Sequence, residues 1–270
     1  MNEYVVNNWN ELECKLFEDA YDSGIARYRS NYVFRGIADK NFDLKTSLNR
    51  VCKDKLKLEQ CLLRNFEKYA SKELVKSGFW ETLSVAQHHG LPTRLLDWTF
   101  SPFVALHFAT DNFAQYNCDG AVWCIDFVKA HKYLPNKFAK VLKTNDAYSF
   151  TTKMLDILAP DFNMLQKLEK GDSFVTFFEP PSIDSRIVNQ YALFSVMSNS
   201  SVTLSDWLKK HPDLYKKIII PKQLKLEVRD KLDQINMTER IIYPGFDGLC
   251  KWLTRHYTPT EHIIDTIKSS

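Results

Sequence analysis

The chain has 270 residues and a formal net charge of +3, and 44% of its residues are hydrophobic. This composition supports a substantial core and excludes a chain that is disordered throughout. The charge is too small to indicate a nucleic-acid-binding protein by itself, and it does not exclude one.

The cysteine spacing and the N-terminus bear on metal sites and location. The six cysteines lie at positions 14, 52, 61, 118, 124 and 250, and no two have the spacing of a zinc knuckle. The N-terminus lacks the pattern of a secretion signal, and no apolar stretch is long enough to span a bilayer. We therefore expect reduced thiols, a cytoplasmic location, no membrane association and no metal.

Hydrophobic periodicity and capping residues predict the elements of the first half. Residues 8–21 read as an amphipathic helix, with Asn8 as its cap and Glu11 three residues later. Serine followed by proline at 101–102 suits the start of another helix, since serine caps helices and proline fits the first turn. The remaining predictions are a strand at 32–36, helices at 55–76 and 80–88, and a turn at Gly90.

The second half predicts more strands than the first. A buried strand is expected at 120–127, followed by a mostly helical insertion within 128–170 around residues 153–168. Further strands are expected at 173–178, 185–196 and 214–220, and further helices at 222–235 and 246–253. Short strands that alternate with helices in this way favour an α+β fold. We predict one domain over 1–200 and a strand-helix extension over 201–270 that packs on it.

Residues 84–110 hold the densest group of chemically active side chains. Gly90 and Pro92 bend the chain. A hydroxyl, a planar cation, a carboxylate and a large ring then follow in Thr93, Arg94, Asp97 and Trp98. Together these groups indicate a pocket for an anionic ligand that contains a ring.

Arg35 ends an apolar strand, and an arginine is not left buried without a partner. Either it forms an internal salt bridge, with Asp97 or Asp39, or it points into a cleft toward an anion. Gly36 would let a ligand approach the backbone closely.

Arg94 and Asp97 are three residues apart. If the turn begins a helix, the two lie on one face and form a structural ion pair. The other interpretation is that Asp97 orients Arg94 toward a phosphate or a ribose.

Two further pairs of polar residues have open roles. His88 and His89 are adjacent, so one is expected in the core and the other in the cleft as a donor or general base. Arg186 and Gln190 would face the same side of a strand. Gln190 then either binds ribose hydroxyls or a base edge, or is a polar residue on an exposed strand face.

Several common motifs are absent from the sequence. There is no Gly-x-Gly-x-x-Gly, no Walker loop and no Gly-x-Ser-x-Gly elbow, which disfavours kinases, dehydrogenases and serine hydrolases.

Two segments carry a family resemblance. The first is Phe34-Arg35-Gly36, and the second is Gln-His-His-Gly-Leu-Pro-Thr-Arg-Leu-Leu-Asp-Trp-Thr at residues 87–99. With Pro102 and the later Arg186, Gln190 and Phe194, the chain resembles the FRG-domain family over roughly residues 30–200. It departs from the family at Tyr191-Ala192, where a glutamine-glycine pair is more usual.

The resemblance implies a layout similar to that of ADP-ribosyltransferases. Arg35 would hold a phosphate or the nicotinamide ribose, Thr93 and Arg94 would take the second position, and Gln190 would stand where a glutamate is usual. Because glutamine carries no charge, three alternatives stay open. Glu179 or Asp97 supplies the charge, Gln190 suffices for binding, or the protein binds a nucleotide without turnover. The resemblance also implies a toxin-like phage-defence effector restrained by an antitoxin or regulatory protein.

We therefore expect a split, mostly antiparallel sheet with flanking helices around a cleft, in the manner of an ADP-ribosyltransferase. The cleft would place Arg35, Arg94, Gln190 and His88 as catalytic residues, with NAD also contacted by Gly36, Thr93, Asp97 and Trp98. The first hypothesis is an NAD-dependent ADP-ribosyltransferase that modifies nucleic acid or protein. The second is a nucleotide- or RNA-binding module in which Trp98 and Trp123 stack bases. The third is a nuclease that uses His88 or His89 as a general base.

Overall fold

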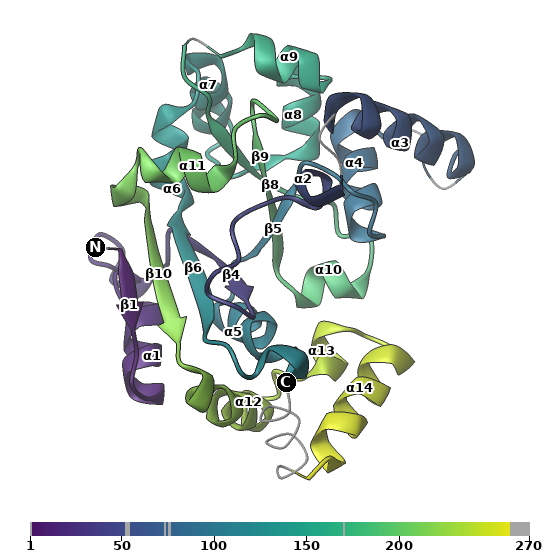
Figure 1. The fold of residues 1–270 in the computed structure, drawn as a ribbon. Coiled ribbons are helices and arrows are strands. Elements are labelled where there is room, and N and C mark those ends of the chain that lie inside the picture. Colours follow the sequence, from purple (N-terminus) through teal and green to yellow (C-terminus); the bar gives the residue numbers. More distant parts are fainter. Residues whose placement is uncertain (1, 52–54, 73, 75–76, 170, 260–270) are drawn as a thin grey trace.

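A mixed sheet runs through the centre of the computed structural model, which describes residues 2–51, 55–72, 74, 77–169 and 171–259 (Figure 1). Its strands lie in the order β1-β10-β6-β4-β5-β9-β8-β7. Their bounds are β1 (Glu3–Val5), β10 (Tyr215–Ile220), β6 (Gly120–Asp126), β4 (Tyr32–Ile37), β5 (Leu96–Thr99), β9 (Ala192–Met197), β8 (Val175–Glu179) and β7 (Phe150–Thr151). A separate small hairpin pairs β2 (Tyr21–Asp22) with β3 (Arg27–Tyr28).

The sheet is divided between β4 and β5. These strands are joined by one residue pair, Phe34 with Thr99. By contrast, β4 pairs with β6 from Tyr32 to Ile37, and β5 pairs with β9 along its whole length. Pairing is antiparallel except at the two edges, where β1 runs parallel to β10 and β7 to β8. The prediction of an α+β fold with a split, mostly antiparallel sheet is therefore confirmed.

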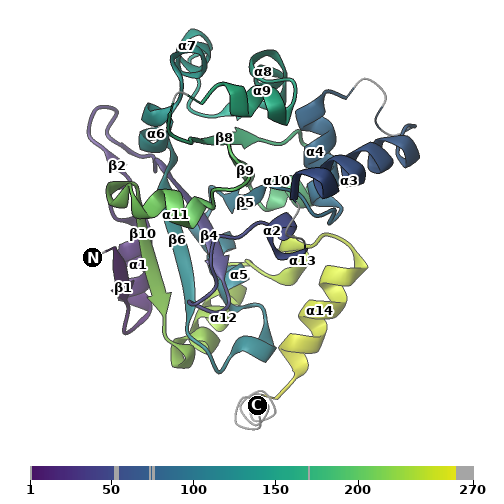
Figure 2. The same cartoon turned by 45° about the horizontal axis from the view of Figure 1, so that its top comes forward.

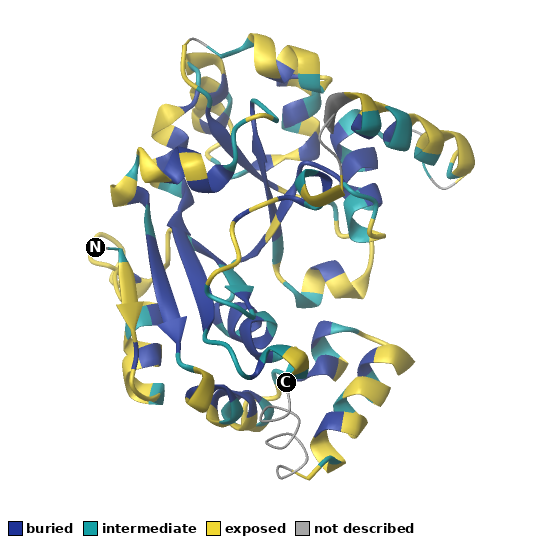
Figure 3. Cartoon of the chain, viewed as in Figure 1, coloured by how far each residue is buried: buried dark blue, intermediate teal, exposed yellow. Residues whose placement is uncertain are grey.

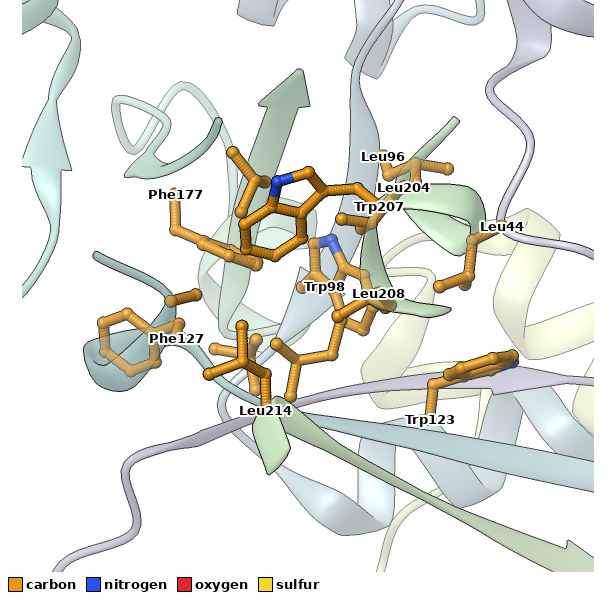
Figure 4. Packing of buried hydrophobic residues seen from close by; sticks show 14 of the residues in the cluster. Leu44, Leu96, Trp98, Trp123, Phe127, Phe177, Leu204, Trp207, Leu208 and Leu214 are labelled. Carbon is orange, nitrogen blue, oxygen red and sulfur yellow. The ribbon is translucent and has the colours of Figure 1, made fainter. Parts of the chain in front are cut away.

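Three groups of helices cover the sheet. Successive side chains of a strand point to opposite faces, and both sets are buried here, so both faces need a covering layer. One face of the β1-β10-β6-β4 half packs against α1 (Trp9–Phe17), α5 (Pro102–Thr110) and α12 (Lys225–Gln234). The opposite face packs with α6 (Phe127–Ala130) and α11 (Leu204–Lys209) around Trp98, Trp207 and Phe177 (Figure 4). Figure 3 shows the buried central strands and the exposed outer sides of these helices.

The β9-β8-β7 half has its own helical layer. It consists of α4 (Phe79–His88), α7 (Asn136–Thr144), α8 (Thr152–Leu158) and α9 (Phe162–Lys167), and the last three lie at the top of Figure 2. The other helices are α2 (Ser47–Val51), α3 (Lys55–Tyr69), α10 (Ser185–Asn189), α13 (Glu239–Ile242) and α14 (Phe246–Tyr257). Short 3-10 turns lie at Phe113–Gln115, His131–Tyr133, Pro212–Leu214 and Lys222–Leu224.

Two predicted helix starts are confirmed by their caps. The Asn8 side chain accepts a hydrogen bond from the Glu11 amide, and the Glu11 carboxylate accepts one from the Asn7 amide. Ser101 accepts from the Val104 amide, with Pro102 in the first turn of α5. Local capping chemistry therefore fixes where α1 and α5 begin.

The predicted strand at 185–196 is wrong in its first half. Asp184 accepts a hydrogen bond from the Ile187 amide and caps the short helix α10. The helix ends at Asn189, Tyr191 has a left-handed φ of 51°, and β9 begins only at Ala192. Arg186 and Gln190 therefore do not share a strand face, because a cap that joins nearby residues outweighs the strand pattern.

The helix predicted at 55–76 ends at Tyr69, and positions 73, 75 and 76 lie outside the described residues, as does Cys52. The division at residue 200 stays a prediction, although β10 from the predicted extension lies inside the sheet between β1 and β6. Over the described part of the chain, no helix combines the length and apolar character needed to cross a membrane.

Candidate functional site

A pocket of about 620 Å³ opens where the sheet is divided between β4 and β5. Its size falls within the range of small-molecule sites. β4 contributes Arg35, β5 contributes Asp97, the end of α4 contributes Gln87 and His88, and α10 contributes Arg186. Apolar lining comes from Phe34, Phe108, Ile187, Ala192 and Phe194.

Arg35 and Asp97 face each other across the division. Arg35 Nη1 donates a hydrogen bond to the Asp97 backbone oxygen at 2.6 Å, and it lies 3.7 Å from the Asp97 carboxylate. Burial lowers the pKa of the Arg35 guanidinium, and the Asp97 charge opposes that shift. The side chain is 20% exposed. A guanidinium has five N–H donors, and among the described residues Arg35 makes one hydrogen bond within the protein.

A short relay of side chains orients the Asp97 carboxylate. Gln87 Nε2 donates to both carboxylate oxygens, at 3.1 and 3.0 Å. Thr93 Oγ1 in turn donates to Gln87 Oε1 at 2.6 Å, which leaves the Gln87 amide nitrogen facing Asp97. Thr93 is buried and does not line the pocket, so it positions Gln87 and is not expected to contact a ligand. Asp97 itself is 56% exposed and open to the pocket.

Arg94 does not lie in the pocket. Because residues 96–99 form a strand and not a helix, Arg94 and Asp97 do not pair. Arg94 is 5% exposed, and its Nη2 lies 2.6 Å from the carboxylate of the buried Glu59. Its guanidinium also stacks over Phe162 at 3.5 Å. Arg94 therefore joins α3 to the β5 side of the core, and the predicted catalytic or phosphate-binding role does not fit its position.

Gly36 and Trp98 line the pocket, but packing inside the protein explains both residues better than the predicted contact with NAD. A Cβ at position 36 would lie 1.8 Å from the Ala105 oxygen, so the close approach of α5 requires the glycine. The Trp98 ring is buried in the core, and its Nε1 donates to Ser195 Oγ at 2.8 Å (Figure 4). Trp123 is buried in the same cluster. Trp98 is 3% exposed and Trp123 is 8% exposed, so little of either side chain is open to a base.

His88 and His89 both line the pocket, so the prediction that one of them lies in the core is wrong, although the two differ in exposure. Gly90, with a left-handed φ of +85°, ends α4 just after them. His88 is 8% exposed, and its Nε2 lies 2.6 Å from Asp184 Oδ2 on α10. His89 is exposed on the pocket rim. Burial raises the pKa of Asp184, but hydrogen bonds from the Ile187 amide and from His88 outweigh it and lower that pKa overall.

Gln190 lies on the α10 side of the pocket. Its amide nitrogen donates to the Ile242 oxygen at 3.1 Å, which ties α10 to α13. Arg186 stacks near the Tyr243 ring at 5.3 Å. Glu179, the other carboxylate considered, bonds to Ser149 and lines a separate groove. Of the two candidate carboxylates, Asp97 is the one inside the pocket.

Sequence reasoning missed three contributors to the site. Gln87 lies within the family-like segment, where its proximity to Asp97 could have been noticed. Asp184 and Phe108 gave no signal, because their approach to the pocket depends on how α10 and α5 pack. Within the described ranges, no group of three or more His, Cys, Asp or Glu side chains is arranged to hold a metal ion.

Comparison with known proteins gives one family and one distant relative. The FRG domain matches residues 30–118, a range that includes β4, β5 and the end of α4. The RNA polymerase-associated protein CTR9 of Saccharomyces cerevisiae is 25% identical over 230 residues. That match covers 78% of the chain and 21% of CTR9, so the chain spans about a fifth of the relative. No solved structure matches the chain. The FRG-domain match therefore supports the family resemblance over residues 30–118, and Arg186, Gln190 and Phe194 lie outside the matched range.

Proposed function

We propose that this protein is an NAD-dependent ADP-ribosyltransferase whose site is the pocket between β4 and β5. The observation that carries the proposal is the pairing of Arg35 and Asp97 on one wall of a ligand-sized pocket. NAD carries an anionic pyrophosphate and develops positive charge at the ribose when nicotinamide leaves. A cation and a carboxylate held side by side match those two charges.

Arg35 is suited to the anionic part of the substrate. Its guanidinium is fixed by the Asp97 carbonyl through Nη1, and Arg35 lines the pocket. A fixed planar fork loses little freedom when it binds phosphate oxygens. Arg186 from α10 also lines the pocket and supplies a second cation.

Asp97 is the carboxylate that we assign to the developing positive charge. Two hydrogen bonds from Gln87 hold it in place before any substrate binds. Preorganised charge of this kind lowers a barrier because it needs no rearrangement during reaction. Gln190 then serves binding and not charge stabilisation, which accounts for the missing glutamate at that position.

The acceptor class and the biological role are further parts of the proposal. The acceptor is nucleic acid or protein, and the role is that of a toxin-like phage-defence effector restrained by a partner. Both rest on the resemblance to the FRG-domain family.

The test uses NAD labelled in its adenylate half, incubated with the purified chain and separate pools of protein, RNA and DNA. Nicotinamide release and transfer of label to one pool are the expected result. Arg35→Ala should abolish both, and Arg64→Ala, which removes an exposed arginine on α3 outside this pocket, should not. NAD binding without nicotinamide release would replace the transferase with a binding module. Cut nucleic acid without any need for NAD would replace it with a nuclease.

A further inference from the structure

His88 and Asp184 form a closely joined pair at the edge of the pocket. They come from different elements, the end of α4 and the cap of α10, yet His88 Nε2 lies 2.6 Å from Asp184 Oδ2. The histidine side chain is only 8% exposed, so its ring is held in one place. The functional role proposed above uses neither residue.

The surroundings of Asp184 fix which ring nitrogen of His88 carries a proton. Asp184 Oδ1 accepts a hydrogen bond from the Ile187 amide at 3.0 Å. Because these bonds hold the pKa of Asp184 below its usual value, its carboxyl is ionised and can only accept hydrogen bonds. His88 Nε2 is therefore the donor in this bond, so Nδ1 is an acceptor whenever the ring carries a single proton.

Nδ1 of His88 has no hydrogen-bond partner within the described part of the chain, and His88 lines the same pocket as Arg35 and Asp97. The charged or titratable groups around the ring are Asp184 and Arg186 from α10, His89 at 5.2 Å, Asp97 from β5 and Arg35 from β4. The exposed His89 and Gly90 leave this rim open to an incoming acceptor.

We propose that His88, positioned by Asp184, is the general base that takes the proton from an acceptor hydroxyl or from water. This deepens the proposed transferase function and rests on it. The acceptor class follows from the chemistry. An uncharged O–H group needs a base when it becomes a nucleophile, and a positioned histidine supplies one.

The step balances as follows for a hydroxyl acceptor. The bond between ribose C1′ and the nicotinamide nitrogen breaks, and its electron pair leaves with neutral nicotinamide. The acceptor oxygen forms a new bond to C1′, and its proton passes to His88 Nδ1. Solvent then takes that proton, so one proton is released for each NAD consumed.

The test uses water and added methanol as acceptors, with azide as a nucleophile that has no proton to lose. His88→Ala should lower nicotinamide release and ADP-ribosyl transfer to methanol by about 10²- to 10⁴-fold. Azide should restore nicotinamide release by this variant and yield an ADP-ribosyl azide. A side chain with a purely structural role would not be replaced by azide.

Asp184→Asn tests the positioning residue. Asparagine caps helices as well as aspartate does, so α10 should be retained. Its amide would donate to Nε2 and move the proton to Nδ1, which removes the base. We expect a lower kcat with an unchanged KM for NAD, and restoration by azide. Asp161→Asn is the matched control, because Asp161 caps α9 by the same kind of bond outside this pocket.

The outcomes separate the two proposals. No nicotinamide release by the wild-type chain with any of the three nucleophiles overturns the transferase itself. Release by the wild-type chain with an unchanged rate in His88→Ala overturns the base and leaves the transferase standing. A folded His88→Ala chain that stays inactive with azide also overturns the base. The base is supported if nicotinamide release is slow in His88→Ala and Asp184→Asn, azide restores it in both, and Asp161→Asn releases nicotinamide at the wild-type rate.

Discussion

Arg35 Nη1 donates a hydrogen bond to the backbone oxygen of Asp97 at 2.6 Å, across the place where a single residue pair joins the two halves of the sheet. The internal contact predicted for Arg35 is therefore present, and the same residue lines the pocket. Its role toward a ligand belongs to the function that we propose.

Replacement of Arg35 by lysine should separate these two roles. A lysine keeps the charge but cannot hold the carbonyl and present a planar fork together. We expect NAD affinity to fall by roughly tenfold or more, and the free energy of unfolding to fall by about 1.5 to 3 kcal/mol. Calorimetric titration with NAD and urea denaturation measure the two effects. Arg64→Lys is the control, and equal NAD affinity in Arg35→Lys and wild type would remove Arg35 from the site.

Replacement of Arg94 should affect stability and leave NAD affinity unchanged. Arg94→Met leaves the buried Glu59 carboxylate without its partner, which typically costs about 3 to 5 kcal/mol. NAD affinity of the folded fraction should not change, because Arg94 lies outside the pocket. The double variant Arg94→Met with Glu59→Leu should regain part of the lost stability. Weakened NAD binding in the stable double variant would argue that Arg94 contacts the ligand after all.

Two glycines near the pocket should respond differently to alanine. At Gly36 a Cβ would meet the backbone of α5 at 1.8 Å, so Gly36→Ala should cost about 3 kcal/mol or more, or prevent folding. At Gly90 nothing lies within 4 Å, and only the left-handed φ opposes a side chain, at about 1 to 2 kcal/mol. Thermal unfolding of both variants tests this order. A Gly36→Ala chain as stable as Gly90→Ala would contradict the close approach of α5.

His107 should make the fold sensitive to acid. Its Nδ1 lies 3.0 Å from Arg229 Nη1 inside the core, and burial, with Arg229 second, lowers its pKa to about 3. The unfolded chain binds a proton near the ordinary value of 6.5, so unfolding takes up a proton between these values. Stability therefore falls as pH drops through this window, by up to about 1.4 kcal/mol per pH unit.

His107→Gln removes that proton uptake while it keeps an acceptor for Arg229. Urea denaturation across the window should show a shallower loss of stability for the variant. The neighbouring Asp111 and Glu239, which also have shifted pKa values, are present in both proteins and largely cancel in the difference. Parallel pH profiles would mean that His107 is charged in the folded protein.

The sequence predicts those parts of the fold that local chemistry decides. The caps at Asn8 and Ser101 and the apolar run of β6 depend on neighbours in the chain, so they could be recognised. The segment at 185–196 could not, because Asp184 turns its start into a helix that then brings Gln190 to α13.

The site could be predicted only for residues that lie within the two family-like segments. Arg35, Gln87 and Asp97 come from the two family-like segments, and pairing of β4 with β5 brings them together. The role of Arg94 was predicted wrongly because its partner, Glu59, is 35 residues away, and the packing of α3 brings the two together. Asp184 could not be foreseen, since a separation of 96 residues from His88 leaves no trace in spacing.

Release of nicotinamide from NAD by the wild-type chain and by Asp97→Asn tests the central claim most directly. Asparagine matches aspartate in shape but lacks the charge that faces the developing positive charge. We predict steady release by the wild-type protein and a loss of about 10²-fold or more in the variant, with NAD affinity nearly unchanged. Equal release by the two proteins, or none by the wild type, would contradict the account.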